Sequence, residues 1–310
     1  MSLKLGVHVG QQNMSMDTMR AVWRKLDPHM DWISAWDHFY EAPPAGGTVD
    51  HFEAMTTLGA LAAETSHARL GCLVFYVGYR NPASIAKAAC TLDHISGGRF
   101  ELGLGAGWHE PEARAFGYDF PSVGQRLDML DEAATIIRGM LTEPRTTFHG
   151  KHYHVENASN LPAPLQQRLP IWIGGLGEKK TLKIVARHAD GWNAAYTTPE
   201  NFARLGKILD AWCEEQDRDP STLRRSINLT FNLAISAADA ERERQNLREA
   251  WGPAAARIEG GALLGTPAQA IERIREYEAA GADQVNIALR APWNEEALDA
   301  YVSEVMPALR

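Results

Sequence analysis

The chain has 310 residues, of which 45% are hydrophobic and 23% are charged. This composition supplies enough apolar side chains for a large core and excludes an intrinsically disordered chain. The formal net charge is −8 at pH 7, so a nucleic acid or an anionic membrane surface would meet net repulsion. We therefore expect a globular protein that binds neither nucleic acid nor a membrane surface.

The three cysteines, Cys72, Cys90 and Cys213, are scattered along the chain and lack the C-x-x-C spacing of metal and redox sites. Their apolar surroundings are typical of reduced, buried thiols in a cytosolic protein. The first residues lack a charged-then-apolar secretion signal, and no stretch approaches the roughly 18 apolar residues of a membrane span. The sequence therefore predicts a cytoplasmic protein without a membrane segment.

In the first half of the chain, short apolar runs alternate with longer amphipathic stretches, as parallel strands alternate with crossover helices. Ser15 or Asp17 caps the first predicted helix, and Ser122 opens the fourth. Proline is well placed in the first turn of the third helix. The predicted elements are strands at residues 3–9, 30–36, 69–76 and 99–104, and helices at 16–27, at 52–66, from Pro82 to Gly97, and at 124–141.

Residues 145–169 break this alternation. They begin with a predicted hairpin that turns at Gly150, and the Pro-rich stretch up to Pro170 predicts an excursion outside the main structure. Beyond Pro170 the regular alternation resumes. The predicted elements are strands at residues 171–173, 190–194, 226–235 and 284–289, and helices at 178–188, 199–215, 238–258, 267–280 and 295–308.

Eight predicted strands thus alternate with helices, and no linker or change of composition marks a domain boundary. This pattern predicts an α/β protein in which residues 1–310 form a single (β/α)8 TIM barrel with an insertion after the fourth helix. A doubly wound open sheet is the alternative, because periodicity does not show whether the eighth strand pairs with the first.

In such a barrel the functional site is built from the loops at the C-terminal ends of the strands. The fifth predicted strand runs into Gly174, Gly175 and Gly177 and then into a helix with four basic side chains, Lys180 among them. Glycines let the backbone approach a ligand, and a helix start offers N–H groups to an anion, so this segment predicts a phosphate site. The alternative is a tight turn followed by a solvent-facing basic helix. The segment matches neither a Walker A loop nor a complete dinucleotide fingerprint.

Other candidates lie at the ends of the second and fourth strands. His38, after Asp37, is suited to orient and protonate a substrate, and His109 has the same chemistry. Alternatively, Asp37 caps the next loop while His38 packs beside it. Gly105 and Gly107 fit a strand end where a flat ring lies against the backbone, or a crowded interior that needs small residues. Further polar candidates at strand ends are His8, Gln11, Tyr76, Trp108, Asn193, Asn232 and Arg290.

Two common kinds of catalytic centre are not predicted. His149, His152 and His154 lie in the predicted hairpin, but no HxxxH helix or carboxylate triad accompanies them, so we predict no metal site. The chain has no G-x-S-x-G elbow, and no cysteine has a histidine partner in sequence. Lys87, a candidate Schiff-base lysine, falls inside a predicted helix, away from a strand end. These observations favour a bound organic cofactor as the source of the chemistry.

A series of motifs runs through nearly the whole chain. They lie at residues 79–87, 91–99, 102–109, 116–117, 126–127, 172–175 and 189–193. In content and order they resemble the bacterial-luciferase-like flavin monooxygenase superfamily. Within it, the turn at Asp37 and His38 and the segment from Gly105 to His109 look most like members that use the deazaflavin coenzyme F420.

The resemblance implies a barrel with a cofactor ring lying across the strand ends and its phosphate in the glycine-rich loop. It also implies a non-prolyl cis peptide bond at the end of the third strand, near Phe75 and Tyr76, that presses on the ring from behind. Trp108 stands where a sugar-phosphate dehydrogenase branch has a glutamate, which argues against that substrate. The residues expected to bind the cofactor are Asp37, Phe75, Tyr76, Gly105, Gly107, Trp108, Gly174, Gly175, Gly177, Lys180 and Asn193.

The function that the resemblance implies is hydride transfer between F420 and a small organic substrate, with His38 or His109 as proton donor or acceptor. Deazaflavin lacks the ring nitrogen that favours one-electron and oxygen chemistry. The alternatives are an FMN-dependent monooxygenase served by a separate reductase, and a non-catalytic flavin-binding barrel. Relatives commonly dimerise through helices that flank the second and third strands, so we expect a homodimer.

Overall fold

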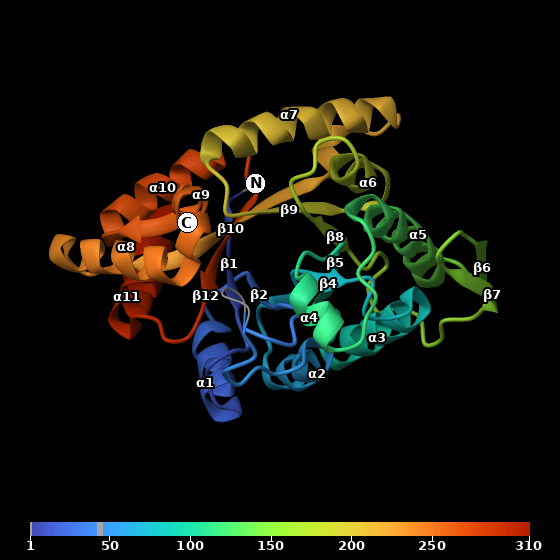
Figure 1. Cartoon of the computed structure of the whole chain (residues 1–310), viewed down its shortest axis with the longest axis horizontal. Coiled ribbons are helices and arrows are strands. Elements are labelled where there is room, and N and C mark those ends of the chain that lie inside the picture. Colours follow the sequence, from blue (N-terminus) through green and yellow to red (C-terminus); the bar gives the residue numbers. More distant parts are fainter. Residues whose placement is uncertain (1, 42–45) are drawn as a thin grey trace.

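The computed structural model of the chain describes residues 2–41 and 46–310, which form a closed barrel of parallel strands (Figure 1). The first and last barrel strands pair in parallel along their whole length, and β9 pairs with β10. These two pairings close the sheet, so the predicted barrel is confirmed and the open-sheet alternative is wrong. In order around the barrel the strands are β1 (Lys4–Val9), β2 (Trp32–Ala35), β3 (Arg69–Cys72), β5 (Phe100–Gly105), β8 (Ile171–Gly174), β9 (Gly191–Ala195), β10 (Arg224–Leu233) and β12 (Gln284–Leu289).

Helices cover the outside of the barrel (Figure 1), and their starts follow the capping signals of the sequence. The Ser15 side chain accepts a hydrogen bond from the first turn of α1, and Ser122 forms a capping box with Gln125 at the start of α5. None of the helices among the described residues is both long and apolar enough to cross a bilayer. The principal helices are α1 (Met16–Leu26), α2 (Ala54–Glu64), α3 (Pro82–Ile95), α5 (Val123–Thr142), α6 (Thr181–His188), α7 (Pro199–Glu215), α8 (Ala237–Trp251), α10 (Pro267–Ala279) and α11 (Glu295–Ala300).

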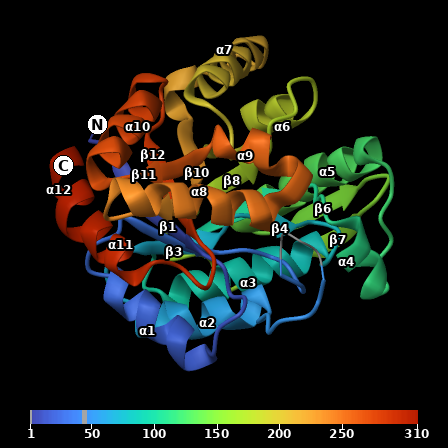
Figure 2. The same cartoon turned by 60° about the vertical axis from the view of Figure 1, so that its left-hand side comes forward.

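Some elements differ from the sequence-based expectation. The predicted helix at 238–258 is interrupted at Gly252, where φ is +49°, so it becomes α8 and the short α9 (Ala255–Glu259). Both helices pack on β11 (Ala262–Gly265), an additional strand that pairs with β10 (Figure 2). The helix α4 (Glu110–Ala115) was not predicted either, because six residues are too short to show a helical period.

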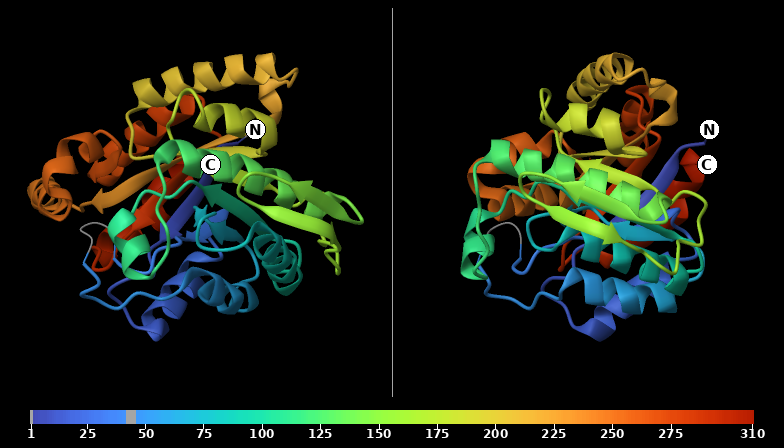
Figure 3. Two further views of the ribbon diagram at one scale, coloured as in Figure 1. Left: turned by 45° about the vertical axis from the view of Figure 1, so that its right-hand side comes forward. Right: turned by 90° about the vertical axis from the view of Figure 1, so that its right-hand side faces the viewer.

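The predicted insertion after the fourth helix is confirmed. Strands β6 (Thr146–His149) and β7 (His154–Ala158) form an antiparallel hairpin that follows α5 and makes its own small sheet. Figure 3 shows this hairpin at the edge of the molecule, outside the barrel wall. The insertion therefore leaves the alternation of strands and helices in the barrel intact.

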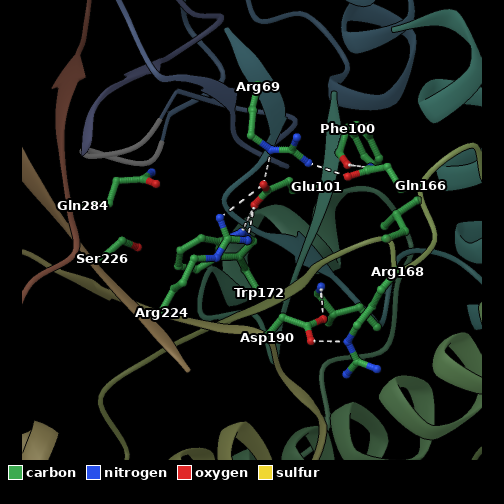
Figure 4. A network of polar contacts seen from close by, with 12 residues as sticks. Arg69, Phe100, Glu101, Gln166, Arg168, Trp172, Asp190, Arg224, Ser226 and Gln284 are labelled. Carbon is green, nitrogen blue, oxygen red and sulfur yellow. Dashed lines mark hydrogen bonds and ion pairs between the residues drawn. The ribbon is translucent and has the colours of Figure 1, made fainter. Parts of the chain in front are cut away.

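The N-terminal end of the barrel interior is closed by a buried carboxylate. Glu101 on β5 is 1% exposed and accepts hydrogen bonds from Arg69, Arg224 and the indole N–H of Trp172 (Figure 4). The Arg69 guanidinium also donates to Gln166 of the insertion, over 2.6 Å. This end of the barrel is filled by paired charges, so the opposite end is left for a ligand.

Candidate functional site

A cavity of about 590 Å³ lies at the C-terminal ends of the barrel strands. Its volume suits an organic ligand of cofactor size. Eleven of the thirteen predicted site residues line it, whereas Phe75 and Lys180 do not. The eleven are Asp37, His38, Tyr76, Gly105, Gly107, Trp108, His109, Gly174, Gly175, Gly177 and Asn193.

One wall of the cavity is formed where the third barrel strand is interrupted. After β3 ends at Cys72, a non-prolyl cis peptide bond joins Leu73 to Val74, and the chain resumes as β4 (Phe75–Tyr76), which pairs with β5. The expected cis bond is thus present, but two residues before the expected position. Because side chains alternate along a strand, Val74 and Tyr76 line the cavity while Phe75 is fully buried in the core. Phe75, which was expected to bind the cofactor, therefore does not line the cavity.

Two glycines face Val74 across this wall. A Cβ atom at Gly105 would lie 2.4 Å from Val74 Cγ2, and one at Gly174 would lie 3.0 Å from Val74 Cγ1. Any side chain at these positions would have to displace Val74. The absence of side chains from the ends of β5 and β8 lets Val74 pack against their backbone, and the two glycines and Val74 together line the cavity.

The glycine-rich loop after β8 turns back on the start of α6. Gly175 has a φ of +136°, a region that residues with side chains rarely adopt, and its N–H donates to the carbonyl of Asn193 over 3.1 Å. A Cβ atom at Gly177 would lie 2.6 Å from Oγ1 of Thr181, the first residue of α6. This compact loop and the helix start together offer backbone N–H groups to a phosphate.

The basic side chains of this segment do not face the cavity. Lys180 Nζ lies 2.8 Å from Asp128 on α5, and Arg187 pairs with Asp131 on the same helix. Ion pairs with α5 thus neutralise two of the four basic side chains, and Lys180, which was expected to bind the cofactor, does not line the cavity. The sequence could not reveal these partners because they lie about 50 residues away in the chain.

Asp37 fixes the edge of the cavity. Its Oδ2 atom accepts hydrogen bonds from the backbone N–H of Tyr76 over 3.0 Å and from the guanidinium of Arg80 over 2.8 Å. Burial raises the pKa of this carboxyl, and the nearby Arg80 acts against that shift. These contacts join the end of β2 to the segment that contains β4, so these partners of Asp37 lie beyond the third barrel strand and not in the loop that follows Asp37.

His38 is held by a carboxylate that the sequence analysis did not single out. Glu112 on α4 is completely buried, and each of its oxygens lies 3.2 Å from Nδ1 of His38. The same carboxylate accepts hydrogen bonds from the backbone N–H groups of Phe39 and Tyr40 and from the hydroxyl of Tyr79. The loop that carries His38 is therefore anchored on α4.

His109 completes this cluster. Its Nδ1 lies 3.5 Å from Glu112, the ring centroids of His38 and His109 are 5.8 Å apart, and neither ring nitrogen of His109 has a hydrogen-bond partner among the described residues. Ligand atoms of these three residues all lie within 4.8 Å of one another, which is a possible metal-binding arrangement. The oxygens of Glu112 are already used by the hydrogen bonds described above, and the geometry is that of a carboxylate that orients imidazole rings.

The opposite edge of the cavity is positively charged. Arg290 follows β12, and its guanidinium carbon lies 4.4 Å from the ring centroid of Trp251 and 5.3 Å from that of Trp36. Arg257 of α9 lines the same cavity. Burial and the charge of Arg290 lower the pKa of His8 to about 3, so that this imidazole is neutral near pH 7. An anionic group of a ligand would be accommodated best at this edge.

The sequence of the cavity-forming barrel matches a known family model. The match to the luciferase-like monooxygenase model extends over residues 30–284 and so includes β2 to the start of β12. The chain belongs to the luciferase-like monooxygenase family. The superfamily that the sequence motifs resemble is therefore confirmed.

Relatives of this luciferase-like chain include proteins whose names describe them as F420-dependent. It is 27% identical to the F420-dependent glucose-6-phosphate dehydrogenase of Intrasporangium calvum, over 83% of this chain and 84% of that protein. It is 34% identical over 145 residues to an uncharacterised protein of Mycobacterium tuberculosis, and that match spans 47% of this chain and about half (49%) of the relative.

Solved structures share the luciferase-like fold along the whole chain. An F420-dependent secondary alcohol dehydrogenase in complex with an F420–acetone adduct has a TM-score of 0.87 at 20% identity, with both chains covered completely. A long-chain alkane monooxygenase has a TM-score of 0.80 at 14% identity, over 100% of this chain and 91% of that one. At these identities the comparisons establish the fold.

Several cavity residues of this luciferase-like barrel were not found from the sequence. Glu112 lies in the unpredicted helix α4, and Trp251 and Arg257 come from α8 and α9, where helical spacing gives no sign of a ligand. One signal was available for Glu112. It stands three residues after His109, so a short helix would place both side chains on one face.

Proposed function

We propose that this luciferase-like barrel is an F420-dependent oxidoreductase that transfers a hydride to or from a small organic substrate. The observation that carries the proposal is the backbone wall of Gly105 and Gly174 against Val74, with the glycine-rich loop at its edge. These residues fit a planar ring with a phosphate near it: Cβ atoms at the two glycines would displace Val74, which lines the cavity together with them. Bound deazaflavin would supply two-electron hydride chemistry.

His38 is the proposed proton donor or acceptor. Its ring lines the cavity, its Nδ1 atom contacts Glu112, and 16% of its side chain is exposed. In carbonyl reduction the imidazolium would give a proton to the substrate oxygen, and in alcohol oxidation the neutral ring would take that proton. Trp108, 60% exposed and 5.3 Å from the His38 ring, would form an apolar wall for the substrate.

The names of the relatives support F420 over FMN, since two of the similar proteins are F420-dependent glucose-6-phosphate dehydrogenases. The second candidate function is an FMN-dependent monooxygenase that receives reduced flavin from a separate reductase. It is supported by solved neighbours such as the alkane monooxygenase. A phosphate near the ring is common to both cofactors, so the glycine-rich loop suits either.

Equilibrium titration of the purified protein with F420 and with FMN tests the cofactor, with fluorescence as the readout. We expect tighter binding of F420. An anaerobic screen would then offer reduced F420 with carbonyl compounds, and oxidised F420 with alcohols. The screen includes compounds with a carboxylate, because Arg257 and Arg290 line the cavity. Tighter binding of FMN together with oxygen consumption would favour the monooxygenase instead.

Replacement of His38 by alanine separates catalysis from storage of the cofactor. We expect His38→Ala to bind F420 with nearly the affinity of the wild type and to lose about 100-fold or more in kcat, since general acid–base catalysis contributes at least that factor. His149→Ala, a change of an exposed histidine in the hairpin, is the control and should behave as wild type. Equal turnover by all three proteins would indicate another proton carrier, whereas F420 binding without turnover in any of them would indicate a non-catalytic binding protein.

We further infer that residues 1–310 act as one cytoplasmic domain that forms a homodimer. Three buried cysteines without disulfide bonds fit a reducing compartment. The dimer proposal rests on the family's common use of helices next to the second and third strands, here α2 and α3. Light scattering coupled to gel filtration measures the assembly directly, and a mass near 34 kDa would exclude the dimer.

A further inference from the structure

We propose that Glu112 is the positioning residue of this site: it holds the Nδ1 edge of His38 and thereby presents Nε2 to the substrate. The identity of the reacting ring rests on the proposed function. The orientation of the ring rests on the contacts of Glu112 alone, so the two claims can fail separately.

The hydrogen-bond pattern determines which nitrogen of His38 carries the proton. Both oxygens of Glu112 lie 3.2 Å from Nδ1. An ionised carboxylate can only accept, so Nδ1 must donate. In the neutral ring Nε2 is then an acceptor, which suits a base, and in the charged ring it is a donor, which suits an acid. The same orientation of the ring therefore serves both directions of the reaction.

Glu112 is itself held in place and kept ionised. Its Oε2 accepts from the N–H groups of Phe39 and Tyr40 over 2.8 and 3.0 Å, and its Oε1 accepts from the Tyr79 hydroxyl over 2.6 Å. Burial by itself would raise the pKa of Glu112, but the close approach of His109 and the hydrogen bonds from His38 and Tyr79 outweigh it and lower the pKa below the ordinary range. The carboxylate thus keeps its charge and its orientation before any ligand binds.

Other titratable groups face His38 as well. His109 approaches the same carboxylate, His8 and His51 lie near enough to interact electrostatically, and Asp37 is paired with Arg80. Protonation of both His38 and His109 would place two positive charges beside one carboxylate. Glu112 is therefore the carboxylate that both imidazole rings approach.

Nitrogen NMR of the imidazole rings tests the orientation in the cofactor-free protein. With ¹⁵N-labelled histidine, and His38→Ala to assign the signals, we expect the neutral His38 ring to carry its proton on Nδ1. In Glu112→Gln the amide can also donate, so the tautomers should mix. A wild-type ring that carries its proton on Nε2, or a tautomer unchanged in Glu112→Gln, would overturn the proposal.

The consequence for turnover is tested with the loaded enzyme. Glu112→Gln should lower kcat by about 10- to 100-fold, by analogy with groups that orient metal-ligating histidines, with little change in KM or in F420 affinity. The pH at which the activity changes should move to lower values, because the charged form of His38 loses its partner. Glu112→Asp should recover part of kcat and return the pH profile toward that of the wild type.

Two further variants separate positioning from a folding defect. Glu110→Gln makes the same chemical change on the same helix, at an exposed residue that pairs only with Arg114 among the described residues, and should behave as wild type. Tyr79→Phe removes one donor from Glu112 and should give a smaller effect in the same direction, even if Glu112→Gln does not fold. A normal pH profile in Tyr79→Phe and in folded Glu112→Gln would contradict the proposal. The expected NMR result without any F420-dependent turnover would support the orientation and contradict the proposed function.

Discussion

At the scale of single residues, two glycines determine the position of Val74 in the cavity wall. Val74 occupies the wall between β5 and β8 because Gly105 and Gly174 leave room for it. The sequence indicated that these glycines were special, but it could not distinguish a ligand-facing wall from a crowded interior. Val74, which lies between β3 and β4, shows that both descriptions apply. The two glycines pack against Val74, and Val74 itself lines the cavity.

Gly105→Ala tests this account. Its methyl group would overlap Val74, so we expect the free energy of unfolding to fall by about 1–3 kcal/mol and cofactor affinity to fall with it. Gly59→Ala, inside α2 with open space around it, is the matched control and should raise the free energy of unfolding by about 0.5–1 kcal/mol. Chemical denaturation gives both values. A neutral Gly105→Ala with normal binding would refute the account.

At the scale of elements, the N-terminal ends of three strands are joined by one carboxylate. Glu101 of β5 binds Arg69 at the start of β3 and Arg224 at the start of β10, on the other side of the barrel (Figure 4). The arginines are about one-third exposed, whereas Glu101 is buried. Loss of the carboxylate would leave two like charges close together, partly screened by water.

Glu101→Gln should therefore lower the free energy of unfolding by about 2 kcal/mol, less than for a fully buried pair because water reaches the arginines. Cofactor binding should change little, since the cavity lies at the other end of the barrel. Urea denaturation measures the first value and fluorescence titration the second. As the control, Glu156→Gln on the exposed hairpin should stay within about 0.5 kcal/mol of wild type. Equal stability of the two variants would show that the Glu101 network is dispensable.

At the scale of the whole molecule, two neutral histidines make the fold sensitive to acid. Burial, with smaller contributions from nearby charges, lowers the pKa of His8 to about 3 and that of His51 to about 4, from 6.5. The unfolded chain therefore takes up protons at a higher pH than the folded chain. Their stabilising contribution is complete above pH 6.5 and is lost progressively as the pH falls toward these values.

We expect the free energy of unfolding to drop by about 2–3 kcal/mol for each pH unit below 6.5, since there are two such histidines and each differential proton contributes about 1.4 kcal/mol per unit. His8→Gln, which keeps a hydrogen-bonding partner for Ser34, should reduce this slope by up to half. Urea denaturation at pH 7, 6 and 5 gives the free energy of unfolding at each pH, and hence the slope. A slope that His8→Gln leaves unchanged would mean that other groups cause the acid sensitivity.

The sequence by itself determined the order and bounds of most barrel elements, the helix caps and the glycine-rich loop. Each depends on neighbours within a few residues, as Ser122 and Gln125 do at the start of α5. The tertiary structure alone decided that β12 closes on β1, that Lys180 pairs with Asp128, and that Glu112 meets His38 across 74 residues. Hydrophobic periodicity records which face of an element is buried, whereas the partner of a charge depends on how distant segments pack.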